Sequence, residues 1–430
     1  MQGPGSAPQT RQFFDDGRVG VYVHLPFCER ICPYCDFAVV AARNLEAKVE
    51  ADYVAGVRRE LEARRSAFEG RELASIYFGG GTPSLFEPES IRSLIEAIHA
   101  AFPSAGNAAA SPGPNVETTL ELNPSSLEQS RLPGFRDVGV DRLSIGIQSF
   151  DDRQLKRLGR AHRADVARST LESARAAGFE NLSIDLIFGG PDQSEDDLER
   201  DLAELIEWKP DHVSVYELTF EPATPFGRAL AAGKMQACDD ERAAGMTLQI
   251  ESRLEAEGLE RYEISSYARE GMRSRHNARY WKRQAVLGLG MGAHSMEARS
   301  VSSPHGARRA NPRTLEAWTR ALAEDAGEVG AEETLPPRTA RGEAVFLALR
   351  QKEGLSARSF EAEFGAPPRA FFEAEIEEMI GRGYLVEGES PRKNGGDVSA
   401  GAGSDPADLR LSDEGRLMAD SVALSFVSDE

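Results

Sequence analysis

The sequence predicts an α/β protein built on an open, parallel, six-stranded barrel, followed by a smaller helical domain. Three observations in the 430-residue chain lead to this fold class. Six short β-rich runs alternate with stretches of helical period, which is typical of a parallel sheet with right-handed crossovers. Polar or glycine-rich residues end or follow nearly every run, as at the C-terminal edge of a barrel. The last hundred residues change to helices and one hairpin.

The six expected strands are residues 21–25, 74–78, 118–122, 142–147, 182–188 and 212–218. Between the second and third, residues 88–102 place apolar side chains on one helical face, and Pro88 suits the first turn of that helix. Ser194 and Asp197 form a capping-box pattern that opens another helix. A doubly wound sheet would gather its site at one switch point. The spread of polar residues over several strand ends therefore favours a barrel, left open because only six units are visible.

The C-terminal part shows a winged-helix pattern. Helices are expected over residues 343–350, 356–364 and 369–382, then a hairpin with strands 384–387 and 409–411, and a helix from Asp413. Such a unit can bind DNA, but residues 331–430 hold 11 Lys plus Arg against 20 Asp plus Glu, a net charge of −9. A domain that reads DNA is basic. We therefore expect a structural or protein-contact role.

The composition restricts the partners and the compartment. The chain has 50 Lys plus Arg and 70 Asp plus Glu, a net charge of −20, which disfavours nucleic acid and anionic membrane surfaces. No apolar run reaches the ~18–20 residues of a membrane span. The first 20 residues lack the positive end and apolar stretch of a signal peptide. We expect a cytoplasmic protein without a transmembrane segment, in which thiols stay reduced.

These patterns suggest four regions. We expect a flexible N-terminal tail over residues 1–18, the barrel over 19–235, a barrel extension over 236–335 and the C-terminal domain over 336–430. Two stretches, residues 104–115 and 389–408, are poor in core residues and rich in Ala, Gly, Ser, Pro and Asn. Both are expected to be long surface loops or disordered insertions.

Three of the four cysteines fall within eight residues. Cys28, Cys32 and Cys35 are clustered, while Cys238 stands alone in an acidic stretch and is expected to be a bystander. In a reducing compartment such a cluster of thiols indicates metal ligands. Thiolates hold both zinc and iron–sulfur clusters, so the donor type leaves both open. Zinc would need a fourth ligand, for which His24 is the candidate. On a four-iron cluster, three ligands would leave one iron open.

The cysteine spacing, with Tyr34 before the last cysteine, resembles the cluster loop of the radical S-adenosylmethionine (SAM) superfamily. Five segments resemble the oxygen-independent coproporphyrinogen III oxidase family and its relatives: VYVHLPFCERICPYCDF, YFGGGTPS, ELNP, SIGIQSF and LGRAH. The resemblance extends from about residue 21 to about residue 420. It implies a partial (β/α)6 TIM-type radical SAM barrel, a [4Fe-4S] cluster held by Cys28, Cys32 and Cys35, and SAM as second cofactor.

Two features distinguish branches of that family. The dehydrogenases carry a further cysteine two positions after the third cluster ligand, where this chain has Phe37. The segment HNARYW, residues 276–281, resembles the His-Asn-x-x-Tyr-Trp motif of the haem-chaperone branch. This resemblance implies a protein that binds haem and delivers it to membrane haemoproteins of the respiratory chain, with no residue assigned a catalytic role. It leaves a homodimer open.

Two alternatives remain at this stage. One is an oxidoreductase of porphyrin biosynthesis, which would decarboxylate coproporphyrinogen III oxidatively to protoporphyrinogen IX. A weaker one is a barrel stabilised by zinc and without redox chemistry.

The resemblance also implies ligand contacts. Glycine lets backbone approach a ligand closely, and Gly80, Gly81 and Thr82 match SAM contacts. Further matching positions, some of them for a second SAM in the dehydrogenases, are Tyr22, Tyr34, Glu121, Gln148, Arg160 and Asp185. His276 is the expected haem ligand because imidazole is a common axial ligand, and its motif is expected to face a crevice between the domains. A packed, structural motif is the alternative, and His294 is expected to be structural.

Overall fold

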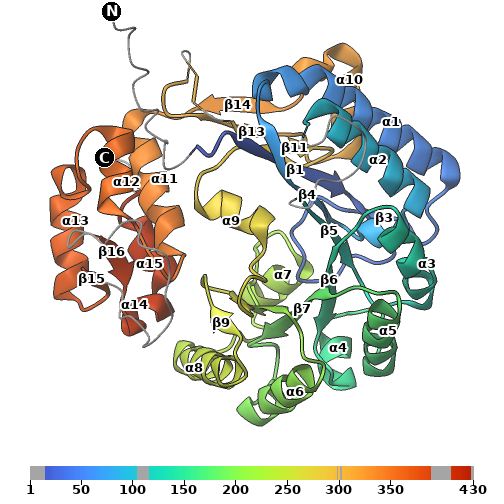
Figure 1. Ribbon diagram of the computed structural model, residues 1–430. Coiled ribbons are helices and arrows are strands. Elements are labelled where there is room, and N and C mark those ends of the chain that lie inside the picture. Colours follow the sequence, from blue (N-terminus) through green and yellow to red (C-terminus); the bar gives the residue numbers. More distant parts are fainter. Residues whose placement is uncertain (1–14, 104–115, 298, 301–302, 389–407, 428–430) are drawn as a thin grey trace, which may run out of the picture.

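Six parallel strands, hydrogen-bonded in chain order, form the centre of the molecule (Figure 1). The computed structural model describes residues 15–103, 116–297, 299–300, 303–388 and 408–427. The central strands are β1 (Arg18–Leu25), β4 (Glu72–Gly80), β5 (Glu117–Leu122), β6 (Arg142–Gln148), β7 (Asn181–Phe188) and β8 (His212–Glu217). All six predicted strands are confirmed. β8 pairs with β10 (Ser266–Ala268) and not with β1, so the barrel is open, as expected.

Helices cover the convex face of this sheet (Figure 1). They are α1 (Ala47–Arg64), α2 (Pro88–Ala101), α3 (Ser126–Asp137), α5 (Ala164–Ala176), α6 (Glu195–Glu207) and α8 (Asp240–Ala256), with the shorter α4 (Asp152–Arg157). The short helix α7 (Pro225–Ala231) lies instead beside the cysteine loop, where the Phe226 N–H donates to the Pro33 carbonyl at 3.0 Å. Helix α2 begins at Pro88 and buries the predicted face. The predicted capping box opens α6, because Ser194 and Asp197 each accept a hydrogen bond from the other's backbone N–H. The local patterns therefore specify these helices directly.

Strand alternation separates an apolar core from a polar concave face. In β1, Val19, Val21 and Val23 are fully buried in the core beneath the helices, and the residues between them point to the other side. The concave positions of the other strands carry polar groups: Ser75, Tyr77, Thr119, Glu121, Arg142, Ser144, Ser183, Asp185, His212 and Ser214. An ordinary β/α barrel fills this space with layers of branched aliphatic side chains. This interior is suited instead to surround polar groups.

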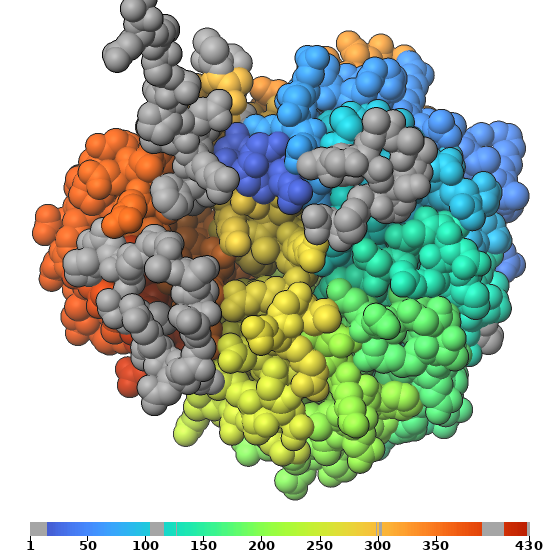
Figure 2. All heavy atoms as spheres, viewed as in Figure 1, coloured from blue at the N-terminus to red at the C-terminus, as the bar shows by residue number. Residues whose placement is uncertain are grey.

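The sheet continues beyond both edges of the barrel to twelve strands. On the β1 side it adds β11 (Val286–Leu289), β12 (His294–Glu297), β13 (Ala307–Ala310) and β14 (Ala331–Thr334), and beyond β10 lies β9 (Glu260–Arg261). Helix α10 (Leu315–Glu324) packs on α1. The seven-residue helix α9 (Arg275–Trp281) contacts β4. In Figure 2, the yellow segment that includes α9 and β10 fills the centre between the barrel and the C-terminal helices.

The C-terminal helices have a core of their own, built around Phe360, Phe372 and Phe426. The order is α11 (Pro337–Leu349), α12 (Ala357–Phe364), α13 (Arg369–Gly381), the hairpin β15 (Leu385–Glu387) and β16 (Leu409–Leu411), α14 (Asp413–Leu417) and α15 (Ala419–Leu424). The predicted winged-helix order is confirmed. Arg283, just after α9, makes ion pairs of 2.8 Å with Glu343 and with Glu363, which fix this unit to the barrel extension.

Three sequence-based predictions concern segments that the structure describes only in part. Residues 104–115 and 389–407, expected to be loops or insertions, lie outside the described residues. Of the expected tail, residues 1–14 also lie outside them, whereas Asp16 pairs with Arg279 at 3.0 Å and Arg18 begins β1. Ordered structure therefore extends into the predicted tail. Within the described ranges, no helix is long and apolar enough to cross a membrane.

Candidate cluster and cofactor site

The cysteine loop lies at the C-terminal edge of the sheet. Cys28 belongs to the short strand β2 (Phe27–Cys28), which follows β1 almost directly and pairs with β3 (Val40–Ala41). Cys32 and Cys35 lie in the loop between these strands, where the N–H of Cys35 donates to the carbonyl of Cys32 at 3.1 Å. None of the three thiols forms a disulfide, and all three are partly exposed. The loop therefore presents three thiolate donors where the carboxyl ends of the strands meet.

The donor set fits an iron–sulfur cluster better than a zinc ion. Within the described ranges, no three His, Cys, Asp or Glu side chains are grouped to hold one metal ion. Zinc draws all its ligands to within about 2.3 Å of one point, whereas in a four-iron cluster each thiolate takes its own iron.

His24 is also unsuited to be a fourth zinc ligand. Its Nε2 bonds the Ala38 carbonyl at 2.8 Å, and its Nδ1 bonds the Tyr22 hydroxyl at 3.0 Å. Burial lowers the pKa of His24 to about 4, so the ring is neutral near pH 7. Nε2 therefore donates to the carbonyl and Nδ1 accepts from the tyrosine. Neither nitrogen has a lone pair left for a metal.

Burial raises the pKa of the Cys28 thiol to about 11, against the opposing effect of a hydrogen bond from Thr82. Burial likewise raises the pKa of Cys35. Both groups are thiols near pH 7 when no metal is bound. Since a cluster binds thiolates, loading must displace these protons, and iron uptake is expected to improve with rising pH.

The glycine segment holds the base of the cysteine loop against β4. Gly80 has φ +110°, and a Cβ there would lie 2.4 Å from the His24 ring. A Cβ on Gly81 would lie 2.6 Å from the Pro26 carbonyl carbon. The N–H groups of Gly81 and Thr82 donate to Leu25 and Phe27 carbonyls, each at 2.9 Å. A bound amino acid would therefore have to meet groups other than these N–H donors.

Glu121 and Asp185 lie on the concave face near this edge. Tyr77 donates to Glu121 Oε1 at 2.7 Å, and the N–H of Gly80 donates to Oε2 at 3.1 Å. Burial raises the pKa of Glu121 to about 7. Asp185 accepts from Ser144 at 2.9 Å, and burial raises its pKa. Both carboxyls are thus anchored by hydroxyl donors inside the polar barrel.

Three other predicted residues lie at the ends of strands or beside the cysteine loop. Gln148 ends β6 with φ +69°, a left-handed conformation that is unusual for a residue other than glycine. Arg160 donates through Nη1 to Cys32 Sγ at 3.5 Å. Tyr34 packs on Phe226, with ring centroids 6.2 Å apart. Most of the predicted cofactor residues therefore surround one edge of the sheet.

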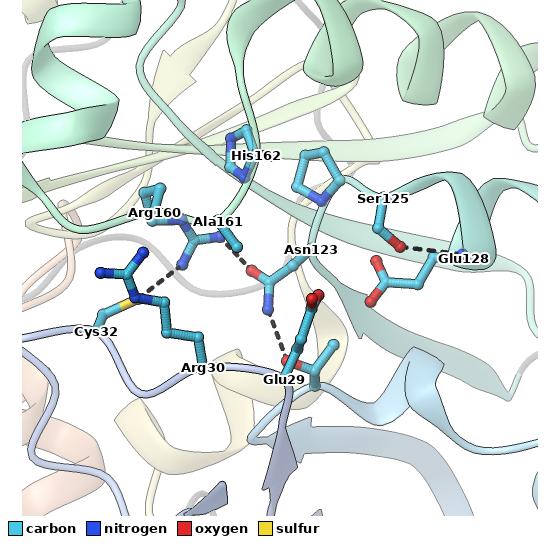
Figure 3. Close-up of a pocket in the computed structure, with 11 residues that line it drawn as sticks. Glu29, Arg30, Cys32, Asn123, Ser125, Glu128, Arg160, Ala161 and His162 are labelled. Atoms are coloured by element: carbon cyan, nitrogen blue, oxygen red, sulfur yellow. Dashed lines mark hydrogen bonds between the residues drawn. The ribbon is translucent and has the colours of Figure 1, made fainter. Parts of the chain in front are cut away.

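A polar pocket lies beside Cys32 (Figure 3). Its lining includes Asn123 and Glu128, which are not among the site residues predicted from the sequence. Asn123 belongs to the ELNP segment, so the resemblance offered a signal for it. Glu128 is the third residue of α3, where the hydroxyl of Ser125 accepts from its N–H.

Glu128 provides a test of this pocket's burial. Burial raises the pKa of the Glu128 carboxyl from 4.5 to about 8. Since the folded-state pKa lies above the unfolded value, the stabilising contribution is complete below about pH 4.5 and is lost as the pH rises through about 8. Glu128→Gln cannot titrate, so its melting temperature should fall less than that of the wild type between about pH 5 and pH 8.5. If the melting temperatures of the two proteins changed by the same amount across that pH range, Glu128 would not have the raised pKa of a buried carboxyl.

His276 lies on the concave face, so the prediction that it faces a crevice between the domains is wrong. Its side chain is 1% exposed. Nδ1 bonds the Ser75 hydroxyl at 2.9 Å, and Nε2 lies 3.4 Å from the Tyr280 hydroxyl. Burial lowers the pKa of His276 to about 3. Haem ligation through Nε2 would require its contact with the Tyr280 hydroxyl to break and the buried ring to become accessible.

The remaining sequence candidates lie elsewhere. Trp281, at the end of the same motif, does lie at the domain junction, since the Arg350 guanidinium is 5.0 Å from its ring centroid. Cys238 accepts a hydrogen bond from Arg242 at 3.2 Å. His294 begins β12 and is exposed.

Comparisons with known proteins place this geometry in a family. A family model for the radical SAM superfamily matches residues 22–205, and one for the HemN C-terminal domain matches residues 335–390. The solved structure of E. coli coproporphyrinogen III oxidase (HemN), a radical SAM enzyme, has a TM-score of 0.76 with 21% identity and covers 96% of this chain and 90% of that one. At that identity the likeness shows the fold alone.

Two relatives of higher sequence identity show the family to which this chain belongs. The heme chaperone HemW of Bacillus subtilis is 31% identical over 86% of this chain and 93% of its own length. The heme chaperone HemW of Haemophilus influenzae is 34% identical over 86% of this chain and 92% of its own length. Since each match covers most of both chains at more than 30% identity, the chain belongs to the HemW family of haem chaperones, within the radical SAM superfamily.

Proposed function

We propose that this protein is a haem chaperone that carries one [4Fe-4S] cluster on Cys28, Cys32 and Cys35 and delivers haem to membrane haemoproteins of the respiratory chain. The observation that carries the choice of chaperone is Phe37, which is 71% exposed beside the cysteine loop. Dehydrogenases of the resembling family have a cysteine at this position. The relatives named heme chaperone support the same choice.

The residues at this edge of the sheet would bind the cluster and SAM. When bound, the cluster would supply one electron and an open iron position for SAM. The three cysteines would hold it, and Thr82 and Arg160 donate hydrogen bonds to two of their sulfurs. Glu121 keeps an acceptor for a ribose hydroxyl on each oxygen, since each accepts one hydrogen bond within the protein. We propose Tyr22, Tyr34, Gly80, Gly81, Gln148 and Asp185 as the surrounding contacts.

The haem site is proposed separately from the cluster. Because both His276 nitrogens are occupied, we propose that His276 holds α9 against β4 and that the axial ligand lies elsewhere. Trp281 offers aromatic surface at the domain junction, beside the positive Arg350. A flat apolar ring with carboxylate groups suits such a junction.

His276→Ala tests this division of roles. It removes a buried ring and its hydrogen bonds, so we expect the protein to lose about 2–4 kcal/mol of stability. The absorption spectrum of added haem should stay as in the wild type. Melting temperature and the haem spectrum are measured on the same preparation. A variant of normal stability with an altered haem spectrum would instead make His276 the iron ligand.

We also propose a cytoplasmic location and a homodimer for this protein. Four cysteines without a disulfide suit a reducing compartment such as the cytoplasm. A homodimer would be detected by size measurement before and after cluster loading.

The proposed function is tested by haem binding and transfer. The reconstituted protein is titrated with haem under anaerobic conditions, and haem-free cytochrome b in membranes is then added. We expect a protein-bound haem spectrum that saturates, followed by loss of that spectrum as the membranes gain haem. A spectrum identical to that of free haem at every ratio would overturn the proposal.

A further inference from the structure

Asn123 links two side chains that bond to the cluster cysteines (Figure 3). Thr82 Oγ1 donates to Cys28 Sγ at 3.6 Å, and Arg160 Nη1 donates to Cys32 Sγ at 3.5 Å. Asn123 lies between these donors. Its Nδ2 donates to Thr82 Oγ1 at 2.7 Å, and its Oδ1 accepts from Arg160 Nη2. We call Thr82, Asn123 and Arg160 the Asn123 bridge.

The proton positions in the Asn123 bridge are fixed by its chemistry. A guanidinium can only donate, so Asn123 must turn its oxygen to Arg160 and its NH₂ to Thr82. The Thr82 oxygen then accepts from Asn123, and its single hydroxyl hydrogen is free to point at the Cys28 sulfur. Without the Asn123 amide, the Thr82 hydroxyl would lose the donor that turns its hydrogen toward Cys28, and Arg160 would lose one of its acceptors.

The surrounding structure leaves room for the bridge and buries its Thr82 end. Arg160 Nη2 also donates to the Gly146 carbonyl at 2.8 Å. A Cβ on Gly146 would lie 2.8 Å from Asn123 Oδ1 and 3.3 Å from Arg160 Nη2, so a larger residue would displace both. Thr82 is 4% exposed. Hydrogen bonds are stronger where water is excluded.

We propose that Asn123 is a positioning residue that sets the reduction potential of the cluster by aiming two hydrogen bonds at its cysteine sulfurs. The inference rests on the cluster of the proposed function. Hydrogen bonds to the sulfurs are among the factors that set cluster potentials. They stabilise negative charge on the thiolates, and the reduced cluster carries one more negative charge. The Asn123 bridge therefore favours reduction.

Asn123→Ala is compared with the wild type by redox titration of the anaerobically reconstituted cluster, followed by electron paramagnetic resonance without SAM. Asn123→Ala removes the amide that orients both donors, so the hydrogen bonds to the two sulfurs weaken. We therefore expect full iron content and an equilibrium shifted about tenfold toward the oxidised cluster, which is about 59 mV more negative for one electron. Thr82→Val should shift the potential in the same direction, whereas Thr82→Ser, which keeps the hydroxyl, should not.

The outcomes separate this inference from the proposed function. Iron-loaded Asn123→Ala and Thr82→Val proteins with the wild-type potential would overturn the inference alone. If Asn123→Ala fails to load iron, the comparison of Thr82→Val with Thr82→Ser decides, and equal potentials in that pair overturn it. A wild-type protein that binds no iron would overturn the proposed function and this inference together.

Discussion

Replacing Cys28, Cys32 or Cys35 by alanine is expected to abolish the iron–sulfur cluster. The wild type should contain about four irons and four sulfides per chain after anaerobic reconstitution. Each substitution removes one thiolate, and His24 cannot replace it because both of its ring nitrogens are bonded within the protein. Iron and sulfide content and the visible absorption of the cluster are measured for each variant.

Cys238→Ala is the matched control for this prediction. Cys238 packs beside α8 and accepts from Arg242, so its loss should leave iron and sulfide content unchanged. Zinc instead of iron in the anaerobic wild-type preparation would contradict the cluster assignment. So would a cluster that survives the loss of any one of the three cysteines in the loop.

Gly81→Val is expected to abolish cluster binding, although it leaves all three cysteines in place. The new Cβ would lie 2.6–2.8 Å from backbone atoms of Pro26 and Phe27, and backbone cannot turn aside as a side chain can. Overpacking of this kind costs about 1–3 kcal/mol. Because Cys28 directly follows Phe27, the displaced segment carries the first ligand with it. Iron content should therefore fall steeply.

Gly381→Val is a matched control, because a Cβ at Gly381 meets no atom within 4 Å. It should load iron as the wild type does. A Gly81→Val protein with full iron content and wild-type affinity for SAM would show that the close approach of Gly81 to Pro26 has no role in the site.

The fold was predictable because its signals are local. The short β-rich runs, the Pro88 helix start and the Ser194 capping box each extend over a few residues, and each appears in the structure as expected. The order of strands follows from the general rules for parallel sheets. The three cysteines were recognisable because all three lie on one short loop.

The inner contacts of the site were not predictable, because they join residues distant in sequence. Asn123 meets Arg160 across 37 positions, and His276 meets Ser75 across 201. The HNARYW pattern marked His276 as a candidate ligand, but no sequence signal showed that both ring nitrogens would be occupied. Resemblance identified the motif, and only the packing of α9 on β4 showed which way it faces.

We propose that the chain, as a haem chaperone, has no coproporphyrinogen oxidase activity, although its fold matches that of HemN. The most direct measurement is anaerobic incubation of the cluster-loaded protein with coproporphyrinogen III, SAM and a reductant, followed by porphyrin analysis. We expect coproporphyrinogen III to be recovered unchanged while the same preparation binds added haem. Accumulation of protoporphyrinogen IX over many turnovers would contradict it.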